Sequence, residues 1–254
     1  MLKGALLFTV WQSEPHRRTR DLDLLGRGEP TTERMETVVR EICRVVMPED
    51  GVHFDLDSVR AHQIREDAVY GGIRVTLTAT LGTARIPVQI DVGFGDAVTP
   101  APVEVEFPTL LDLPAPRLLA YPRQTAVAEK LEALVALGQD NSRMKDFYDL
   151  WSLSRAFAFD GPSLCEAVAA TFARRKTPVS AATPVAFTPA FHEDTAKQAQ
   201  WLAFVTRQIE DGNVPSLSAL IEVLASFLMP VIDSVRLGTP FEEAWPPGGP
   251  WRPR

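Results

Sequence analysis

The chain has 254 residues, of which 45% are hydrophobic, and this is enough for one large domain or two modest ones with a hydrophobic core. Its net charge of -7 argues against nucleic-acid binding through bulk charge, so any RNA contact must come from a local basic patch. Cys43 and Cys165 lack the spacing of a zinc site or a disulfide framework. No segment approaches ~20 consecutive apolar residues and no signal-peptide pattern is present, so we expect a cytoplasmic protein that does not cross a membrane.

The first half of the chain is expected to form a mixed or antiparallel sheet with helices. After an apolar segment over residues 2–11, the alternating "DLDLL" at 21–25 predicts a short strand. Residues 31–47 carry apolar side chains at helical spacing behind a threonine N-cap, and they predict a helix. Apolar and polar residues alternate in three further segments, which predict strands at 52–64, 71–82 and 84–96.

The second half is expected to be helical. Six prolines in residues 99–122 rule out a long helix there and place a domain boundary near residue 120. Apolar stripes beyond this boundary predict helices over 123–138, 142–157, 163–175, 194–209 and 216–235. Prolines and glycines near the C-terminus predict a disordered tail. The expected organisation is therefore a domain over 1–120, a helical domain over 121–243 and a tail over 244–254.

Three aspartates on predicted strands form the first candidate site. Alternate side chains of a strand share a face, so Asp21 and Asp23 stand side by side, and Asp91 lies on the polar side of a later strand. Neighbouring carboxylates resist joint ionisation, and a divalent cation is the usual remedy. A D-x-D strand with one further Asp is typical of nucleotidyl transfer, where two Mg²⁺ ions bridge carboxylates and triphosphate. The alternative interpretation is a polar strand end with solvated carboxylates.

A lysine on the first predicted helix of the second half is another candidate. Lys130 stands between Val127 and Leu131, so its stem can lie along apolar surface while its ammonium reaches a phosphate. The alternative is a solvated lysine that pairs with Glu129 or Glu132.

The next predicted helix carries four charged residues within two turns: Arg143, Lys145, Asp146 and Asp149. Asp146 and Asp149 share a face with Arg143, and an internally paired helix surface would explain them without any function. Lys197, on a later helix, is expected to be a solvated surface charge.

Five segments stand in one order along the chain: "LKGALLF", "RTRDLDLL", "IDVGFGD", "YPRQTAVAEKLEAL" and "NSRMKDFYDLW". In this order and at these separations they resemble the AbiEii-type nucleotidyltransferase toxins. These are the enzymatic half of type IV toxin–antitoxin and abortive-infection systems and are related to the mycobacterial MenT toxins. The resemblance covers residues 2–155 closely and the helical remainder more loosely. It implies an α+β fold, in which a polymerase-β-like palm of mixed sheet and helices precedes a helical C-terminal domain.

The resemblance also implies roles for single residues. Asp21 and Asp23 match the D-x-D metal ligands, and Asp91 matches the acidic residue of the later strand. Lys130 matches the lysine of the A-E-K motif, which is expected on the incoming triphosphate. Asp146 matches the first Asp of the K-D-x-x-D motif and is expected to be catalytic.

Four further residues complete the expected substrate-binding set. Lys3 and Gly4 match a K-G segment at the substrate phosphates, where glycine permits close backbone approach and lysine adds charge. Arg143 and Lys145 flank the K-D-x-x-D motif.

The function that the resemblance implies is Mg²⁺-dependent transfer of a nucleotide from an NTP to RNA, most plausibly to a tRNA 3′ end. The implied partners are NTP, the RNA acceptor and a cognate antitoxin of the AbiEi type. Basic residues that could bind RNA lie at 16–20, at Arg143 with Lys145, and at 174–176. The alternative is a member of the same fold that binds NTP for regulation, or modifies protein, without transfer to RNA.

Overall fold

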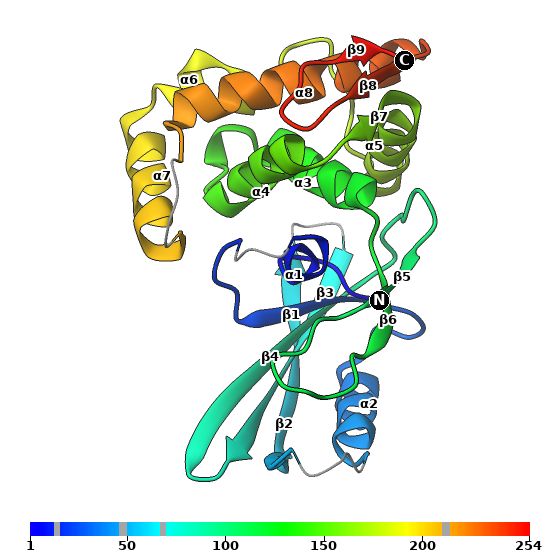
Figure 1. Ribbon diagram of the computed structural model, residues 1–254, viewed down its shortest axis with the longest axis vertical. Coiled ribbons are helices and arrows are strands. Elements are labelled where there is room, and N and C mark those ends of the chain that lie inside the picture. The colour runs from blue at the N-terminus through cyan, green and yellow to red at the C-terminus, as the bar shows by residue number, and fades with distance from the viewer. Residues whose placement is uncertain (13–15, 46–49, 67–69, 210–213) are drawn as a thin grey trace. The chain divides into compact units, whose positions relative to one another are not determined.

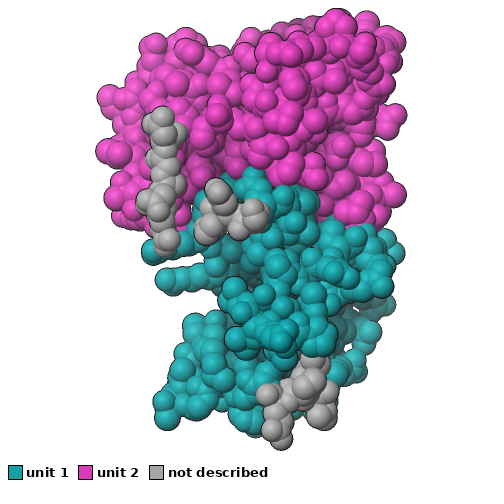
Figure 2. All heavy atoms as spheres, viewed as in Figure 1, with its two compact units in different colours: residues 1–96, 104–120 teal, residues 97–103, 121–254 magenta. Residues whose placement is uncertain are grey.

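A computed structural model describes residues 1–12, 16–45, 50–66, 70–209 and 214–254. The chain divides into two compact units, and Figure 2 shows unit 1 in teal and unit 2 in magenta. Unit 1 comprises residues 1–96 and 104–120, and unit 2 comprises residues 97–103 and 121–254. The main division thus falls where the proline-rich segment predicts it.

A short stretch of the expected first domain belongs to unit 2 instead. Residues 97–103 join unit 2 because Thr99 makes two hydrogen bonds with the hydroxyl of Thr125. The backbone N–H of Thr99 donates to Oγ1 over 3.0 Å, and Oγ1 donates to the Thr99 carbonyl over 2.7 Å. The connection between the units is therefore anchored at its start on the helical side.

Unit 1 is built on a mixed sheet of the strand order β1-β4-β3-β2 (Figure 1). Strand β1 runs parallel to β4, and the other neighbouring strands are antiparallel. A second, two-stranded sheet pairs β5 with β6. The described elements of unit 1 are α1 (Leu7–Trp11), β1 (Asp21–Gly26), α2 (Thr32–Cys43), β2 (Val52–Glu66), β3 (Tyr70–Leu81), β4 (Ala84–Phe94), β5 (Val103–Glu106) and β6 (Arg117–Ala120). The expected fold class, with a mixed sheet and helices, is confirmed, and so are the three predicted long strands.

The two faces of the larger sheet differ in character because polar and apolar residues alternate along its strands. One face packs against α2, whose N-terminus is capped by the Thr31 side chain as predicted. The core there comprises Met35, Val39, Val59, Ile73, Val75, Leu77 and Val92. The opposite face is here called the polar face and is defined by Asp21, Asp23, Arg74, Thr76, Thr78, Gln89 and Asp91. The predicted helix over 31–47 ends at Cys43, and its last two residues lie outside the described residues.

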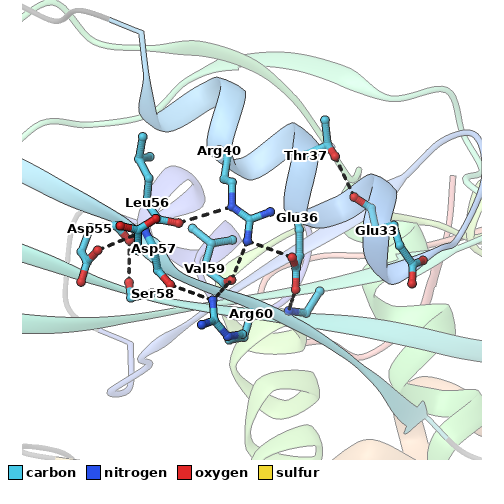
Figure 3. A network of polar contacts seen from close by, with 11 residues as sticks. Glu33, Glu36, Thr37, Arg40, Asp55, Leu56, Asp57, Ser58, Val59 and Arg60 are labelled. Atoms are coloured by element: carbon cyan, nitrogen blue, oxygen red, sulfur yellow. Dashed lines mark hydrogen bonds and ion pairs between the residues drawn. The ribbon is translucent and has the colours of Figure 1, made fainter.

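A bulge in β2 is fixed by side chains of α2 (Figure 3). The register between β2 and β3 shifts between Asp55 and Arg60, which frees backbone groups from the ladder. Arg40 of α2 donates to the carbonyls of Leu56 and Val59, at 3.3 and 3.0 Å. Within the bulge the Ser58 hydroxyl accepts from the N–H of Thr78 over 2.9 Å. The helix thus holds an irregular strand segment in one conformation.

The N-terminal segment adds a short bridge beside β1. Leu2 bridges to both Leu24 and Ala120, and its N–H donates to the Leu119 carbonyl over 2.8 Å. The apolar segment predicted over 2–11 then turns through Gly4 into α1, whose Leu7 and Phe8 are buried. Lys3 and Gly4 are therefore fixed next to the strand that carries the D-x-D pair.

Unit 2 is largely helical, as predicted. Its described helices are α3 (Arg123–Leu137), α4 (Met144–Ala156), α5 (Gly161–Arg175), α6 (Pro189–His192), α7 (Thr195–Gln208) and α8 (Leu217–Leu237), with 3-10 turns η1 (Gly138–Asp140) and η2 (Val185–Phe187). Helix α3 is a central helix rather than an amphipathic surface helix, because α4 and α5 both pack on it. Its side chains are buried on several sides, including those of Val127, Leu131 and Leu134.

Helix α8 is the one described helix that is long and apolar enough, by length and composition alone, to cross a membrane. Its apolar side chains pack inside unit 2, where Leu224, Phe227 and Val231 are fully buried against neighbouring helices. Core packing therefore accounts for its composition.

The C-terminal residues 244–254 are folded, so the expectation of a disordered tail is wrong. They form β8 (Glu243–Trp245) and β9 (Arg252–Pro253), which join β7 (Phe159–Asp160) in a small sheet. The Trp245 indole N–H donates to the Ser154 carbonyl over 2.7 Å, and that of Trp251 donates to the Phe227 carbonyl over 2.9 Å. Proline and glycine disfavour a helix but allow extended chain, and two tryptophans supply enough apolar area to anchor it.

Candidate active site

The three aspartates predicted on strands share the polar face of unit 1. In the register of the sheet Asp23 lies beside Asp91, and Asp21 lies beside Gln89 two residues earlier. Asp21 and Asp23 are half-buried at the start of β1, whereas Asp91 is buried on the central strand β4. Strand pairing thus brings together carboxylates that are 68 or more residues apart in the chain.

Arg74 is a functional candidate that sequence reasoning missed. It lies opposite Asp91 on β3, and its Nε and Nη2 donate to the two carboxylate oxygens of Asp91, each over 2.7 Å. The bidentate bond to Asp91, with the nearby charges of Asp21 and Asp23, raises the pKa of the Arg74 guanidinium. Of the three carboxylates on this face, that of Asp91 is therefore already paired with a protein cation. Alternation along "IRVTL" puts Arg74 on the polar side of its strand, but only the register shows that this side faces Asp91.

Lys3 and Gly4 approach the same carboxylates from the N-terminal segment. The backbone N–H of Lys3 donates to the Asp23 carbonyl over 3.0 Å, and its ammonium lies 2.7 Å from Oδ2 of Asp96. Both side chains of that ion pair are about nine-tenths buried. Gly4 adopts a φ of 71°, and a Cβ there would lie 2.0 Å from Oδ2 of Asp23. Only glycine fits at this position, because a side chain would displace the carboxylate of Asp23.

The lysine and aspartates predicted on two helices also meet, but inside unit 2. The Lys130 ammonium on α3 donates to Oδ1 of Asp146 over 2.9 Å and to Oδ2 of Asp149 over 2.7 Å, both on α4. The two carboxylates are buried, and the Lys130 side chain is only 13% exposed. The alternative of a solvated lysine is therefore wrong for Lys130, and Glu132 binds Arg175 over 2.7 Å. Because Arg175 is paired with Glu132 inside unit 2, the predicted basic cluster at 174–176 does not present three free cations.

Asp146 has a second cation partner at the start of α4. Arg143 Nε lies 2.6 Å from Oδ2 of Asp146, as its spacing predicts, and Lys145 is exposed on the opposite side of the helix. Burial alone would raise the pKa of the Asp146 carboxyl, but the charges of Lys130 and Arg143 outweigh it and the pKa is lowered. Asp146 is therefore an ionised, buried carboxylate at pH 7.

Lys197 is a buried residue and not the predicted solvated surface charge. Its side chain on α7 donates to the Asn141 carbonyl over 2.9 Å, and its ammonium lies 5.2 Å from the centre of the Phe191 ring. Asn141 is buried too, and its Oδ1 accepts from the N–H of Arg143 over 2.8 Å. Lys197 thus supports the loop from which α4 starts, a role that helical spacing alone does not show.

Comparison with known proteins places this geometry in a family. Residues 1–223 match the family described as nucleotidyl transferase AbiEii toxin, type IV TA system. The chain belongs to the AbiEii family. The resemblance of the five motifs is thereby confirmed.

Two solved structures from Helicobacter pylori are similar to the AbiEii chain. One is JHP933, with 13% identity, a TM-score of 0.48, and coverage of 88% of this chain and 79% of that one. The other is a putative nucleotidyltransferase with 12% identity, a TM-score of 0.45, and coverage of 89% and 83%. No curated protein matches the chain.

Membership in the AbiEii family identifies the chain as a nucleotidyltransferase toxin of a type IV toxin–antitoxin system, with NTP as substrate and an antitoxin as partner. A divalent metal is typical of such enzymes, and the carboxylates of Asp21 and Asp23 are the hard oxygen donors that Mg²⁺ prefers. Among the described residues no three His, Cys, Asp or Glu side chains are grouped to hold a metal ion. The donor set therefore fits a metal held by two carboxylates and completed by triphosphate oxygens, with Asp91 bound to Arg74.

Proposed function

We propose that this AbiEii protein transfers a nucleotide from an NTP to an RNA acceptor, at the 3′ end of a tRNA, in a Mg²⁺-dependent reaction in the cytoplasm. The observation that carries the proposal is the pair of half-exposed carboxylates, Asp21 and Asp23, on one face of β1. Among the described residues Asp21 has no hydrogen-bond or ion-pair partner, and Gly4 leaves room at Asp23. Like charges on one face of a strand raise each other's pKa, and a divalent cation between them favours ionisation of both.

The proposed reaction forms a bond between the acceptor 3′ oxygen and the α-phosphorus of the NTP. The bond from that phosphorus to the bridging oxygen breaks, pyrophosphate leaves, and the hydroxyl proton passes to solvent. Mg²⁺ held by Asp21 and Asp23 would neutralise the triphosphate and favour ionisation of the attacking hydroxyl. The protein's own part is to hold the two carboxylates at fixed positions on β1 and to offer the Gly4 backbone close to phosphate.

Arg74 has a separate part in this proposal. Its two bonds to Asp91 keep the third carboxylate in place and reduce the repulsion on the polar face before substrate arrives. Asp91 can then bind the metal only when Arg74 releases its carboxylate, whereas Asp21 and Asp23 are metal ligands throughout the reaction.

Lys130 is proposed to contact the triphosphate, as its motif implies. Asp146 and Asp149 are then positioning residues, because their buried carboxylates fix the ammonium from two sides. Arg143 and Lys145 are proposed to contact substrate phosphates at the start of α4, where both side chains are exposed.

The test is incubation of the protein with each labelled NTP, total RNA and Mg²⁺, followed by separation of RNA, protein and free nucleotide. We expect label at the 3′ end of tRNA-sized RNA in the wild-type reaction and none with Asp23→Asn. Label on protein, or nucleotide binding without any transfer, would contradict the RNA acceptor and favour a protein-modifying or nucleotide-binding role.

A further inference from the structure

A cavity of about 340 Å³ opens on the polar face of unit 1, beside the D-x-D strand. Its volume lies within the range of about 300–1,000 Å³ that is usual for small-molecule sites. Polar side chains from all four strands of the sheet, or from the residue before β1, line it: Arg20, Asp21, Ser58, Thr76, Thr78 and Gln89. Asp21 thus belongs both to the proposed metal pair and to the wall of this cavity.

The sheet register explains why these residues meet. Asp21 lies beside Gln89, which lies beside Thr76 on β3, and Thr78 comes one row further from the carboxylates. Ser58 belongs to the β2 bulge that Arg40 of α2 fixes (Figure 3), and its hydroxyl accepts from the N–H of Thr78 in the same region. The bulge thus contributes Ser58 to the wall of the cavity, and β-bulges commonly redirect side chains beside functional sites.

The chemistry of the lining suits a nucleoside better than a triphosphate. Gln89 donates from Nε2 to Oδ2 of Asp91 over 3.5 Å, and its carboxamide oxygen can still accept from a base edge. The hydroxyls of Thr76 and Thr78 have no partner among the described residues. Pro87 adds an apolar surface on which a base or ribose can lie. Among the described residues that line the cavity Arg20 is the only cation, whereas a triphosphate would need several.

The position of the cavity indicates which nucleoside it takes. Gly4 stands at Asp23, while the cavity starts at Asp21, two residues earlier on the same face of β1. The side chains of Asp21 and Asp23 are separated by about 6.6 Å along β1. If phosphate approaches at Gly4, the group in the cavity comes from the other side of the carboxylates, where the attacking hydroxyl must stand.

Exposed basic side chains continue the surface beyond the cavity. His62 lies opposite Arg74 in the register of β2 and β3, whereas the Arg60 guanidinium donates to the carbonyls of Asp57 and Val59 within the bulge. His62 is exposed, as is Arg20 in the lining of the cavity. Such residues suit the backbone phosphates of a polynucleotide, which a net charge of -7 would otherwise repel.

We infer that this cavity holds the 3′-terminal nucleoside of the RNA acceptor, with Gln89, Thr76 and Thr78 contacting its base and ribose. The inference rests on the proposed transfer at Asp21 and Asp23, whose acceptor it places. The cavity then selects the end of the RNA, and the basic residues around it hold the preceding phosphates.

Binding without NTP tests the inference apart from catalysis, because no transfer can occur. A short labelled RNA is titrated against the protein, and its affinity is compared with that of the same RNA whose terminal nucleotide lacks the base. We expect the loss of the base to weaken binding to the wild type roughly tenfold, through two or so hydrogen bonds. The double variant Thr76→Val, Gln89→Leu should bind both RNAs with the same weakened affinity.

Thr80→Val is the matched control, because Thr80 lies on the same face of β3 but outside the cavity lining. It should retain the wild-type difference between the two RNAs. An RNA with a terminal 4-thiouridine should also crosslink, in the wild-type protein, to peptides of β3 or β4 that contain Thr76 or Gln89.

Each other outcome has a defined meaning. If the double variant still distinguishes the two RNAs, or if the crosslinks fall elsewhere, the inference is wrong. If the variant instead weakens binding of an NTP analogue measured without RNA, the cavity takes the incoming nucleotide and the inference is also wrong. If the terminal base matters as expected but no NTP is ever incorporated, the cavity assignment stands and the proposed transfer fails.

Discussion

The two clusters of charged residues in this protein differ in how deeply their carboxylates are buried. On the polar face of unit 1, Asp21 and Asp23 are half-exposed, and the Arg74 guanidinium bonds the third carboxylate, that of Asp91. Inside unit 2, the buried Asp146 and Asp149 enclose the Lys130 ammonium from two sides. An open cluster of half-exposed carboxylates can reach an ion or a substrate, whereas a closed cluster of buried ion pairs also stabilises the fold around its lysine.

The first prediction tests the open cluster and has the largest expected effect. Asp21→Asn and Asp23→Asn should each reduce nucleotide transfer on the order of 10⁴-fold, because an amide cannot supply the charge that holds Mg²⁺ against triphosphate. The melting temperature should hold or rise, since each change removes like-charge repulsion. Initial rates with labelled NTP and thermal melts measure the two effects. A large loss of stability in either variant would show that the pair is structural.

The second prediction tests the closed cluster. Lys130→Met should lower the free energy of unfolding by about 3–5 kcal/mol, because it removes the ammonium that two buried carboxylates share. Denaturant titration measures this loss, and NTP use should fall with it. The exposed Lys145→Met is the control and should change the stability by about 0.5 kcal/mol or less.

A triple variant sharpens this second test. Adding Asp146→Asn and Asp149→Asn to Lys130→Met removes the two buried negative charges that Lys130 had faced and should recover much of the stability, but not the NTP use. If Lys130→Met is as stable as the wild type, the cluster is not the closed structural unit that its burial indicates. Lys197 is unsuitable as a control, since it is buried and bonds the Asn141 carbonyl.

The third prediction concerns Arg74 on the polar face. Arg74→Met should lower the stability of the metal-free protein by about 1–2 kcal/mol, because Asp91 loses the two hydrogen bonds from the guanidinium. The same change should tighten Mn²⁺ binding, measured by calorimetry, since the carboxylates lose their protein counter-charge. Arg85→Met, an exposed residue on the same strand as Asp91, is the control. Weaker Mn²⁺ binding in Arg74→Met would show that Arg74 supports a metal site that Asp91 completes.

The smallest expected effect is a dependence of stability on acid. The pKa of Asp146 is lower in the folded protein than in the unfolded chain, so its ionised form stabilises the fold above the ordinary Asp pKa. This contribution should be lost as the pH falls below about 4 and through the folded pKa. Denaturant midpoints across this range should fall less steeply in Asp146→Asn than in the wild type. Parallel curves for the two proteins would show that Asp146 is not the titrating group.

The sequence alone determined the features that depend on local pattern. Alternation placed Asp21, Asp23 and Asp91 on the polar side of their strands, and the order of motifs identified the AbiEii family. It also predicted the long strands and the helical second half. These features need no knowledge of which segments become neighbours, because a period of two or of 3.6 residues fixes the face on which a side chain lies.

Only the tertiary structure decided which side chains meet. Strand register gave Asp91 its partner Arg74, and helix packing gave Lys130 the two aspartates in place of its neighbouring glutamates. The same contacts buried Lys197 and folded a proline-rich tail around Trp245 and Trp251. The physical reason is that an ion pair or a packed indole depends on partners far along the chain. Local spacing predicts the face of the helix or strand on which a residue lies, and the partners that packing brings to that face determine its role.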